Sequence, residues 1–324
     1  MPLNAEQIGV INLIEGILFT KLLERRNELF ARGKKLVHYT TAENALNIIK
    51  THSFWMRETR CMNDFSEVTG GHDLLVKYMN TGNNRARFIA ALDGCYPDCG
   101  RDVLKRFDEW WVHIQTSTFV SCFSDHDEPT QDQRGRLSMW RAFGQTSGVA
   151  MILKVPDPFS AIPLKVFLSP VSYPEESELF EQLDELVHRI ESNASALKTI
   201  PRDGLVFAAY RAILMSAVCL KQPAFKEERE WRLVHLPFEE PSPYVSKETE
   251  VIAGIPQVIH KIKLENKPTE DIIGISLPDI VDHIIIGPTQ FPGPIYAALV
   301  HELEKAGVPD ARNKVGFSFI PLRV

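Results

Sequence analysis

The sequence has few cysteines, no excess of basic residues and no long apolar run. Its five cysteines in 324 residues are too few, and odd in number, for a disulfide-stabilised exported protein, so we expect a reducing compartment. Glu6 and Glu15 stand where a signal peptide would carry basic residues. The longest apolar stretch, residues 206–220, contains Arg211 and is shorter than the roughly 20 residues that span a bilayer. We therefore expect a cytoplasmic protein with no membrane partner.

The balance of charge excludes one class of nucleic-acid-binding protein. Lysine and arginine total 36 against 42 aspartate and glutamate residues, which gives a net charge of −6. A global positive field that would hold nucleic acid is therefore absent. A local basic cluster remains near the start of the chain, at Arg25, Arg26, Arg32, Lys34 and Lys35.

Common motifs for nucleotide binding, serine hydrolysis and metal ligation are also missing. The sequence has no Gly-rich dinucleotide loop, no Walker loop and no GxSxG turn, so functions that depend on them are not supported. Cys95 and Cys99 are not followed by a second pair of ligands at zinc spacing, and the ten histidines are widely scattered. We expect no metal site.

The composition that is present, 44% hydrophobic and 24% charged, is typical of a soluble globular protein. Strand and helix patterns interleave without the even alternation of a doubly wound sheet, which predicts an α+β fold. We expect an N-terminal helical extension over residues 1–34, with one long amphipathic helix at 4–31. The rest, 35–324, is expected to be a single domain with helical insertions at about 67–113 and 175–220.

Periodicity predicts the remaining elements. A polar, acidic loop is expected at 124–133, and short helices are expected at 137–143 and 295–306. The expected strands cover residues 35–39, 53–56, 116–123, 149–154, 230–236, 281–286 and 316–320.

The first candidate for binding chemistry is the run His38, Tyr39, Thr40 at the end of a predicted strand. A threonine and Glu43 follow as a capping signal, so a helix is predicted to begin here. An imidazole, a phenol and helix N–H groups at one corner can bind a ribose or a phosphate. The alternative is an ordinary structural histidine.

The second candidate follows the next predicted strand. Arg57 and Arg60 can meet an anionic ligand, although a lone surface arginine is usually solvated. Asn63 and Asp64 precede Glu67 at the spacing of a capping box, so helix capping alone explains them equally well.

The third candidate is the charged run at residues 225–233, FKEEREWRL. Its composition favours a solvated helical face, but the tryptophan and the apolar residues after it favour a strand. In an extended segment Glu228, Glu230 and Arg232 lie on one face, because side chains alternate. Two carboxylates there can bind sugar hydroxyls, stabilise a cation and position a nucleophile.

The fourth candidate is an aromatic pair. Trp140 and Phe143 stand three residues apart in a predicted helix and so share one face. Such a pair can form a platform for a planar ligand, while ordinary packing in the core is the alternative.

Taken together, the order of these motifs resembles a large bacterial family of unknown function, and the resemblance covers about residues 36–323. That family is distantly similar to the ADP-ribosyltransferase superfamily, which binds NAD in a cleft between two small sheets. The motifs that carry the resemblance are HYT at 38–40, MNDFSE at 62–67, SMW at 138–140 before GVA at 148–150, FKEEREWR at 225–232 and SFIPLR at 318–323.

The resemblance implies roles for individual residues. Glu230 would be the catalytic carboxylate that holds the 2′-hydroxyl of the nicotinamide ribose, and Glu228 would orient or deprotonate the acceptor. His38 would hydrogen-bond the adenosine ribose. The other residues implied to bind NAD are Tyr39, Thr40, Arg57, Ser121, Phe123 and Trp140. A histidine start and a Glu-x-Glu end belong to different branches of the superfamily, and Ser117 competes with Ser121, so the acceptor stays open.

The implied fold is an ADP-ribosyltransferase-like split β-sheet core, and the implied activity is an NAD-dependent ADP-ribosyltransferase without a metal. NAD is then a substrate, and the second substrate is a nucleic acid or a protein. A bacterial toxin or phage-defence effector would fit this activity, with an antitoxin or regulator protein as partner. Two alternatives remain: an NAD glycohydrolase that uses water as acceptor, and a non-catalytic binding module on the same fold.

Overall fold

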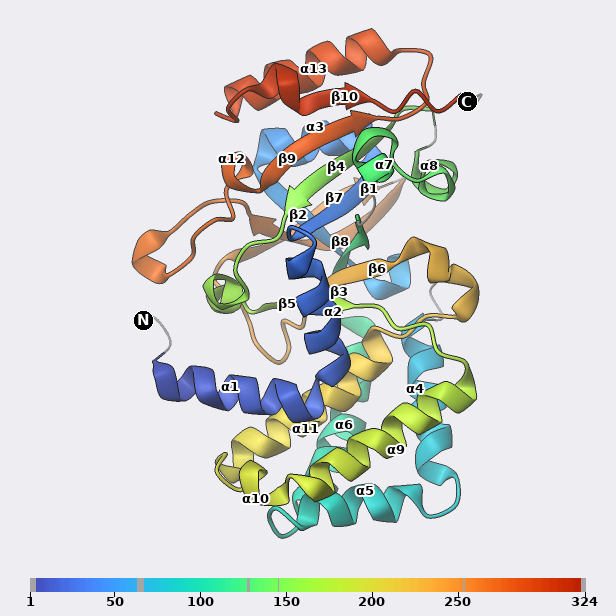
Figure 1. Cartoon of the computed structure of the whole chain (residues 1–324), viewed down its shortest axis with the longest axis vertical. Helices are drawn as coiled ribbons and strands as arrows, with labels where there is room; N and C mark the ends of the chain where they lie inside the picture. Colours follow the sequence, from blue (N-terminus) through green and yellow to red (C-terminus); the bar gives the residue numbers. More distant parts are fainter. Residues whose placement is uncertain (1–3, 63–66, 127–128, 145, 253, 322–324) are drawn as a thin grey trace.

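The computed structural model describes residues 4–62, 67–126, 129–144, 146–252 and 254–321. Figure 1 shows a helical half and a half built on a β-sheet, with α2 running between them. The α-helices are α1 (Ala5–Leu18), α2 (Thr20–Ala31), α3 (Ala42–Thr51), α4 (Glu67–Asn80), α5 (Asn84–Asp93), α6 (Cys99–Thr116), α7 (Pro129–Arg134), α8 (Leu137–Phe143), α9 (Glu176–Ser192), α10 (Ala194–Leu197), α11 (Arg202–Val218), α12 (Leu277–Ile280) and α13 (Pro292–Lys305).

The strands form one ten-stranded mixed sheet in the order β10-β9-β4-β1-β3-β2-β8-β7, with β6 joined to β3 and β5 joined to β6. Only β9 and β10 are parallel among the pairs of named strands. This is the α+β class that the sequence predicts. The strands are β1 (Lys35–Thr41), β2 (Ser53–Glu58), β3 (Phe119–Asp125), β4 (Gly148–Lys154), β5 (Val166–Pro170), β6 (Glu230–His235), β7 (Val245–Ile252), β8 (Ile255–Lys263), β9 (Val281–Ile286) and β10 (Val315–Phe317).

The resemblance implies two separate small sheets, but the strands form one sheet, which divides into two arms at β3. We call this division the fork of the sheet. One edge of β3 pairs with β6 over its whole central part. The other edge pairs with β1 only at Ser124 and Asp125, and with β2 only at Phe119 and Val120. Residues 121–123 therefore lie between the two arms of the fork, and α3 connects those arms. The Thr41 side chain accepts a hydrogen bond from the Asn44 N–H at 3.3 Å, which caps α3 as predicted.

The predicted N-terminal helix is wrong as a single element, because the chain breaks at Phe19 (φ −124°, ψ 38°). Two helices at an angle satisfy two different surfaces. α1 packs along α9, where Arg189 donates to the Ile17 carbonyl at 3.1 Å. α2 instead turns towards the sheet (Figure 1), and an ion pair between Arg26 and Glu15 spans the break.

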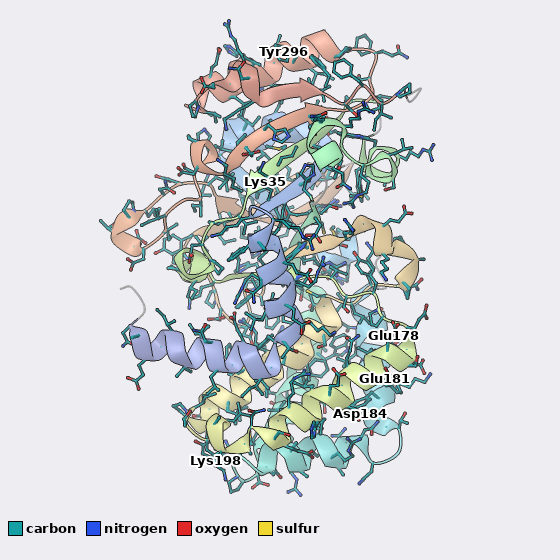
Figure 2. The ribbon with its side chains drawn as sticks, viewed as in Figure 1. Lys35, Glu178, Glu181, Asp184, Lys198 and Tyr296 are labelled. Carbon is teal, nitrogen blue, oxygen red and sulfur yellow. The ribbon has the colours of Figure 1, made fainter. Side chains whose placement is uncertain are left out.

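The sequence predicts helical insertions at about 67–113 and 175–220. The structure has α4–α6 in the first of these segments and α9–α11 in the second. These helices pack on a shared apolar cluster. α9 is amphipathic: Leu183 and Val187 are buried on its inner side, whereas Glu178 and Glu181 are exposed (Figure 2). α11 is buried almost all round, as expected of a central helix.

The structure contains elements that periodicity does not predict. β5 was not expected, nor was the hairpin of β7 and β8, whose outer strand carries Lys247, Glu248 and Glu250 and so lacks a strand-like composition. α7 replaces part of the loop expected at 124–133. β10 ends at Phe317, although the Ser318 N–H still donates to the Ile286 carbonyl of β9 at 2.8 Å; Phe319 then lies in the left-handed region at φ 53°.

Among the described residues, no helix has both the length and the apolar character needed to cross a membrane.

Candidate functional site

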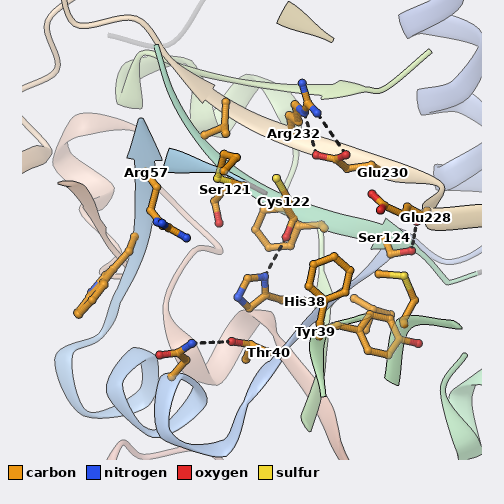
Figure 3. Close-up of a pocket in the computed structure, with 18 of the residues that line it drawn as sticks. His38, Tyr39, Thr40, Arg57, Ser121, Cys122, Ser124, Glu228, Glu230 and Arg232 are labelled. Carbon is orange, nitrogen blue, oxygen red and sulfur yellow. Dashed lines mark hydrogen bonds and ion pairs between the residues drawn. The ribbon is translucent and has the colours of Figure 1, made fainter. Parts of the chain in front are cut away.

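A cavity of about 460 Å³ opens at the fork of the sheet (Figure 3). It is within the size range of small-molecule sites, roughly 300–1,000 Å³. Its walls come from β1, α3, β2, β3, α8, β6 and the segment that leads into β6. Eight of the nine site residues expected from the sequence line it: His38, Tyr39, Thr40, Arg57, Ser121, Phe123, Glu228 and Glu230.

His38 occupies the open edge of β3. Its Nδ1 lies 2.9 Å from the Cys122 carbonyl oxygen, within the gap that neither arm of the fork fills. A carbonyl oxygen only accepts, so this contact assigns the proton to Nδ1 and leaves Nε2 of the neutral ring as an acceptor. Burial lowers the pKa of His38 below its usual value, against the opposing effect of the Cys122 hydrogen bond. The ring is therefore neutral at pH 7.

Aromatic rings hold the imidazole in place. Phe54 on β2 and Phe123 on β3 lie 5.7 and 5.5 Å from the His38 ring, and 5.5 Å from each other. Each arm of the fork and the strand between them thus contributes one ring. Edge-to-face and tilted contacts of this kind fix the orientation of the imidazole.

The two residues after His38 are engaged by neighbouring elements. The Tyr39 hydroxyl accepts a hydrogen bond from the Arg136 N–H at 2.8 Å, so it serves the turn before α8. The Thr40 hydroxyl accepts from the Asn44 side chain at 3.1 Å. Tyr39 and Thr40 therefore shape the wall of the cavity.

Arg57 on β2 and Ser121 on β3 point towards one another in the wall of the cavity (Figure 3). Arg57 is held by the Gln257 side chain at 3.0 Å and the Cys61 carbonyl at 2.6 Å. Figure 3 shows its guanidinium and the Ser121 hydroxyl on the same side of the cavity as the His38 ring. A fixed guanidinium next to a hydroxyl is suited to an anionic or polar ligand.

Glu230, the first residue of β6, is a buried carboxylate with two cationic partners. Its side chain meets Arg232 Nε at 2.8 Å and Lys221 Nζ at 3.2 Å, and the residue is only 5% exposed. Burial alone raises the pKa of the Glu230 carboxyl, but the charges and hydrogen bonds of its cationic partners outweigh burial and lower it to about 2. The carboxylate is ionised throughout the physiological range.

Glu228 reaches the same cation from outside the strand. Its carboxylate lies 2.7 Å from Lys221 Nζ, so the lysine bridges the two glutamates. The prediction that Glu228, Glu230 and Arg232 share one face of an extended segment is wrong for Glu228. That residue ends a 3-10 turn (η3, Pro223–Glu228), and Arg229 follows in the left-handed region at φ 47°.

Backbone contacts fix this turn. The Ser124 hydroxyl donates to the Glu228 carbonyl at 2.5 Å, and Arg136 donates to the Glu227 carbonyl at 2.7 Å. The Tyr173 hydroxyl accepts from the Glu230 N–H at 2.8 Å. These hydrogen bonds between side chains and main-chain groups hold the segment that carries both carboxylates, and no local sequence motif predicts them.

Trp140 is the one expected site residue that does not line the cavity. It is 2% exposed, its indole N–H donates to the Arg134 carbonyl at 2.9 Å, and its ring meets Tyr39 edge-on at 5.1 Å. The helix face that reaches the cavity carries Met139 and Phe143 instead. Trp140 therefore packs in the core, which was the alternative to a platform for a planar ligand.

Other motif residues lie outside the cavity or outside the described part of the chain. Asn63, Asp64 and Arg323 are beyond the described residues. Arg60 pairs with Glu58 at the surface.

Lys221 lines the cavity but is not among the site residues predicted from the sequence. It stands alone after α11, seven and nine residues before the glutamates it bridges. Arg232 was placed on the Glu230 face but not in the site. The only indication of Lys221 in the sequence is that a lysine precedes a pair of acidic residues, and this pattern is weak evidence for a site residue.

Carboxylates pair with four residues of the basic cluster near the start of the chain, and the fifth, Lys34, lies over the Phe30 ring at 4.5 Å. Arg25 pairs with Asp125 and Glu28, and Lys35 pairs with Asp282 at 2.8 Å. Within the described ranges, no group of three or more His, Cys, Asp or Glu side chains is placed to hold a metal ion.

Comparisons with known proteins add one finding. Neither the curated proteins nor the solved structures include a significant match to this chain. The family model described as "Protein of unknown function (DUF2971)" matches residues 139–233, from within α8 to within β6. That stretch carries both glutamates and Lys221, whereas His38 and Arg57 lie outside it. Over residues 139–233 the chain is thus similar to the DUF2971 family, whose function is unknown.

Proposed function

We propose that the protein is an NAD-dependent ADP-ribosyltransferase, with the cavity at the fork as its NAD site and Glu230 as its catalytic carboxylate. The observation that carries the proposal is that Glu230 and His38, 192 positions apart in the sequence, line the same cavity. This pairing is what the resemblance to the ADP-ribosyltransferase superfamily implies. The fork of the sheet is the counterpart, in this proposal, of the cleft between two sheets.

The His38 side of the cavity suits a ribose. With its proton on Nδ1, the ring offers Nε2 as an acceptor for a sugar hydroxyl. Arg57, on the same side, suits the negative charge of a pyrophosphate. Phe54 and Phe123 provide apolar ring surface beside these groups.

The Glu230 side of the cavity suits the bond-breaking step. Nicotinamide leaves with the electron pair of its bond to C1′ of the ribose, which leaves positive charge on the sugar, as in glycoside hydrolysis. An ionised carboxylate already in place stabilises that charge more in the transition state than in the ground state. Arg232 fixes the orientation of this carboxylate through the contact of 2.8 Å.

Lys221 opposes part of this effect, because its positive charge compensates both glutamates. A ribose 2′-hydroxyl that hydrogen-bonds Glu230 would compete with the lysine for the same oxygens. In the proposed Michaelis complex Lys221 therefore moves towards Glu228 and leaves Glu230 to the substrate.

The test is nicotinamide release together with transfer of labelled ADP-ribose, measured for the wild type and for Glu230→Gln. We expect the variant to lose about 10²- to 10³-fold in rate, by analogy with other preorganised electrostatic groups. Glu181→Gln is the matched control, because Glu181 is an exposed carboxylate on α9 (Figure 2). Equal rates in the wild type and Glu230→Gln would refute the assignment of Glu230.

The same assay separates the alternatives. Free ADP-ribose without labelled macromolecule would indicate an NAD glycohydrolase. A non-catalytic module would be indicated if NAD raised the melting temperature but released no nicotinamide. At 100 times its dissociation constant a ligand adds about 2.7 kcal/mol to the unfolding free energy, which a thermal shift detects.

A further inference from the structure

A second cavity, of about 430 Å³, lies on the other face of the sheet from the candidate site. The alternation of β6 shows this arrangement directly. Glu230 and Arg232 line the first cavity, whereas Trp231 and Leu233 line the second. α2 and the 3-10 turn η2 (Pro158–Leu164) contribute to its cover, and Phe54 and Phe123 line both cavities.

This cavity is larger than packing leaves by chance. Protein interiors are close-packed, and voids larger than a single water, whose share of liquid volume is about 30 Å³, are few. Four apolar residues of its lining, on two neighbouring strands, are only partly buried: Val166, Phe167, Leu168 and Leu233. The lining is predominantly apolar, so water is a poor occupant and an apolar molecule is a good one.

The charged side chains of the lining have an excess of positive charge. They comprise four basic groups, Arg26, Lys154, Lys165 and Arg211, against Glu15 and Glu240. Arg26 is matched by Glu15.

The other carboxylate of the lining, Glu240, contacts two cations, and one of them, Arg211, is also paired with Glu239 at 2.7 Å. Glu240 contacts Arg211 at 2.8 Å and Lys165 at 3.3 Å. Lys154 is about half exposed, and its ion pair with Asp282 is long, at 3.8 Å. Lys154 and Lys165 are therefore the cations best placed to accept an additional anion.

We propose that this second cavity is a binding site for an elongated apolar molecule that ends in one anionic group, such as a medium-chain fatty acid. The apolar tail lies against Leu36, Leu168, Trp231 and their neighbours, and the anionic head lies at Lys154 and Lys165. The site is independent of NAD chemistry and does not rest on the proposed function.

Calorimetric titration with decanoate tests the site on the full-length protein. We expect saturable binding to one site per chain. Leu168→Trp fills the cavity and is expected to weaken binding at least tenfold, and Lys165→Glu is expected to weaken it at least fivefold. Decanol, which has the same tail and no charge, is expected to bind at least fivefold more weakly than decanoate.

The controls separate specific binding from adsorption. Lys198→Glu makes the same charge change at an exposed position beyond α10 in the helical half (Figure 2), and its affinity for decanoate should equal that of the wild type. Lys165→Glu changes a partly exposed charge of the lining and leaves the apolar packing unchanged. If circular dichroism shows that Leu168→Trp does not fold, the result for Lys165→Glu decides the test. Absence of saturable binding, or equal affinity in the wild type and both cavity variants, overturns the proposal. Decanol binding as tightly as decanoate overturns the anionic head.

Discussion

The ion pairs of Glu230 make the stability of the protein depend on pH in a way that a single substitution isolates. In the folded protein the pKa of Glu230 is about 2, against an ordinary value of 4.5. A carboxylate whose folded-state pKa is depressed contributes stability above its unfolded-state pKa, and that contribution is lost as the pH falls towards the folded-state pKa. The relevant window therefore runs from about pH 5 down to about pH 2.

The size of the effect follows from the same two values. Their difference corresponds to about 3 kcal/mol of unfolding free energy at pH 7, since one pKa unit is worth about 1.4 kcal/mol. Glu230 is 5% exposed, so solvent screening removes little of this. At pH 3 the unfolded chain is already mostly protonated at this position, and only about 1 kcal/mol remains.

Urea unfolding followed by circular dichroism at pH 7 and pH 3 measures the difference between the wild type and Glu230→Gln. We expect the wild type to exceed the variant by about 3 kcal/mol at pH 7 and by about 2 kcal/mol less than that at pH 3. Glu181→Gln, which removes an exposed carboxylate, should follow the wild type at both pH values. If Glu230→Gln shows the same loss on acidification as the wild type, the buried ion pair does not have the strength argued above.

Three further predictions concern the cavity and its surroundings. Lys221→Met removes a charge that lowers the pKa of Glu230 in the free protein, so the acid limb of the kcat/KM profile for nicotinamide release should move to higher pH; an unchanged limb would contradict the bridge of 3.2 Å. His38→Ala should raise KM for NAD with a smaller effect on kcat, measured by steady-state kinetics, because in the proposed complex the ring would contact the adenosine ribose and not the breaking bond. Gly287→Ala should lower the unfolding free energy by about 1–3 kcal/mol, because the added Cβ would lie 2.7 Å from the Trp140 ring. Denaturant titration measures this loss. The control is Gly293→Ala, whose added Cβ meets nothing within 4 Å and should not destabilise the protein.

Much of the candidate site could be read from local patterns. His38 lies in a strand that leads into a capped helix, and Glu230 begins a strand whose alternation places Arg232 beside it; both features depend on neighbours in the sequence. Trp140 shows the limit of the same reasoning. Its spacing from Phe143 is correct, but which helix face meets the cavity depends on the sheet underneath, and that face presents Phe143.

The acidic pair shows a second limit. Alternation along an extended chain would place Glu228 with Glu230, but Glu228 belongs to a 3-10 turn, and the left-handed conformation at Arg229 separates that turn from the strand, which begins at Glu230. The two carboxylates still converge, because Lys221 reaches both from the end of a helix. Convergence through a third residue has no signature in local spacing.

The sequence by itself determined the α+β class, the position of most helices and strands, and a set of residues suited to bind a nucleotide-like ligand. These follow from periodicity, capping and composition, which act over a few residues. Only the tertiary structure decided that the sheet forks at β3, that His38 fills the open edge, and that a cavity lies on each face of β6. Those features arise from pairing between strands about 100 residues apart, such as β3 with β6. Such contacts depend on the packing of the whole chain, and no local pattern encodes them.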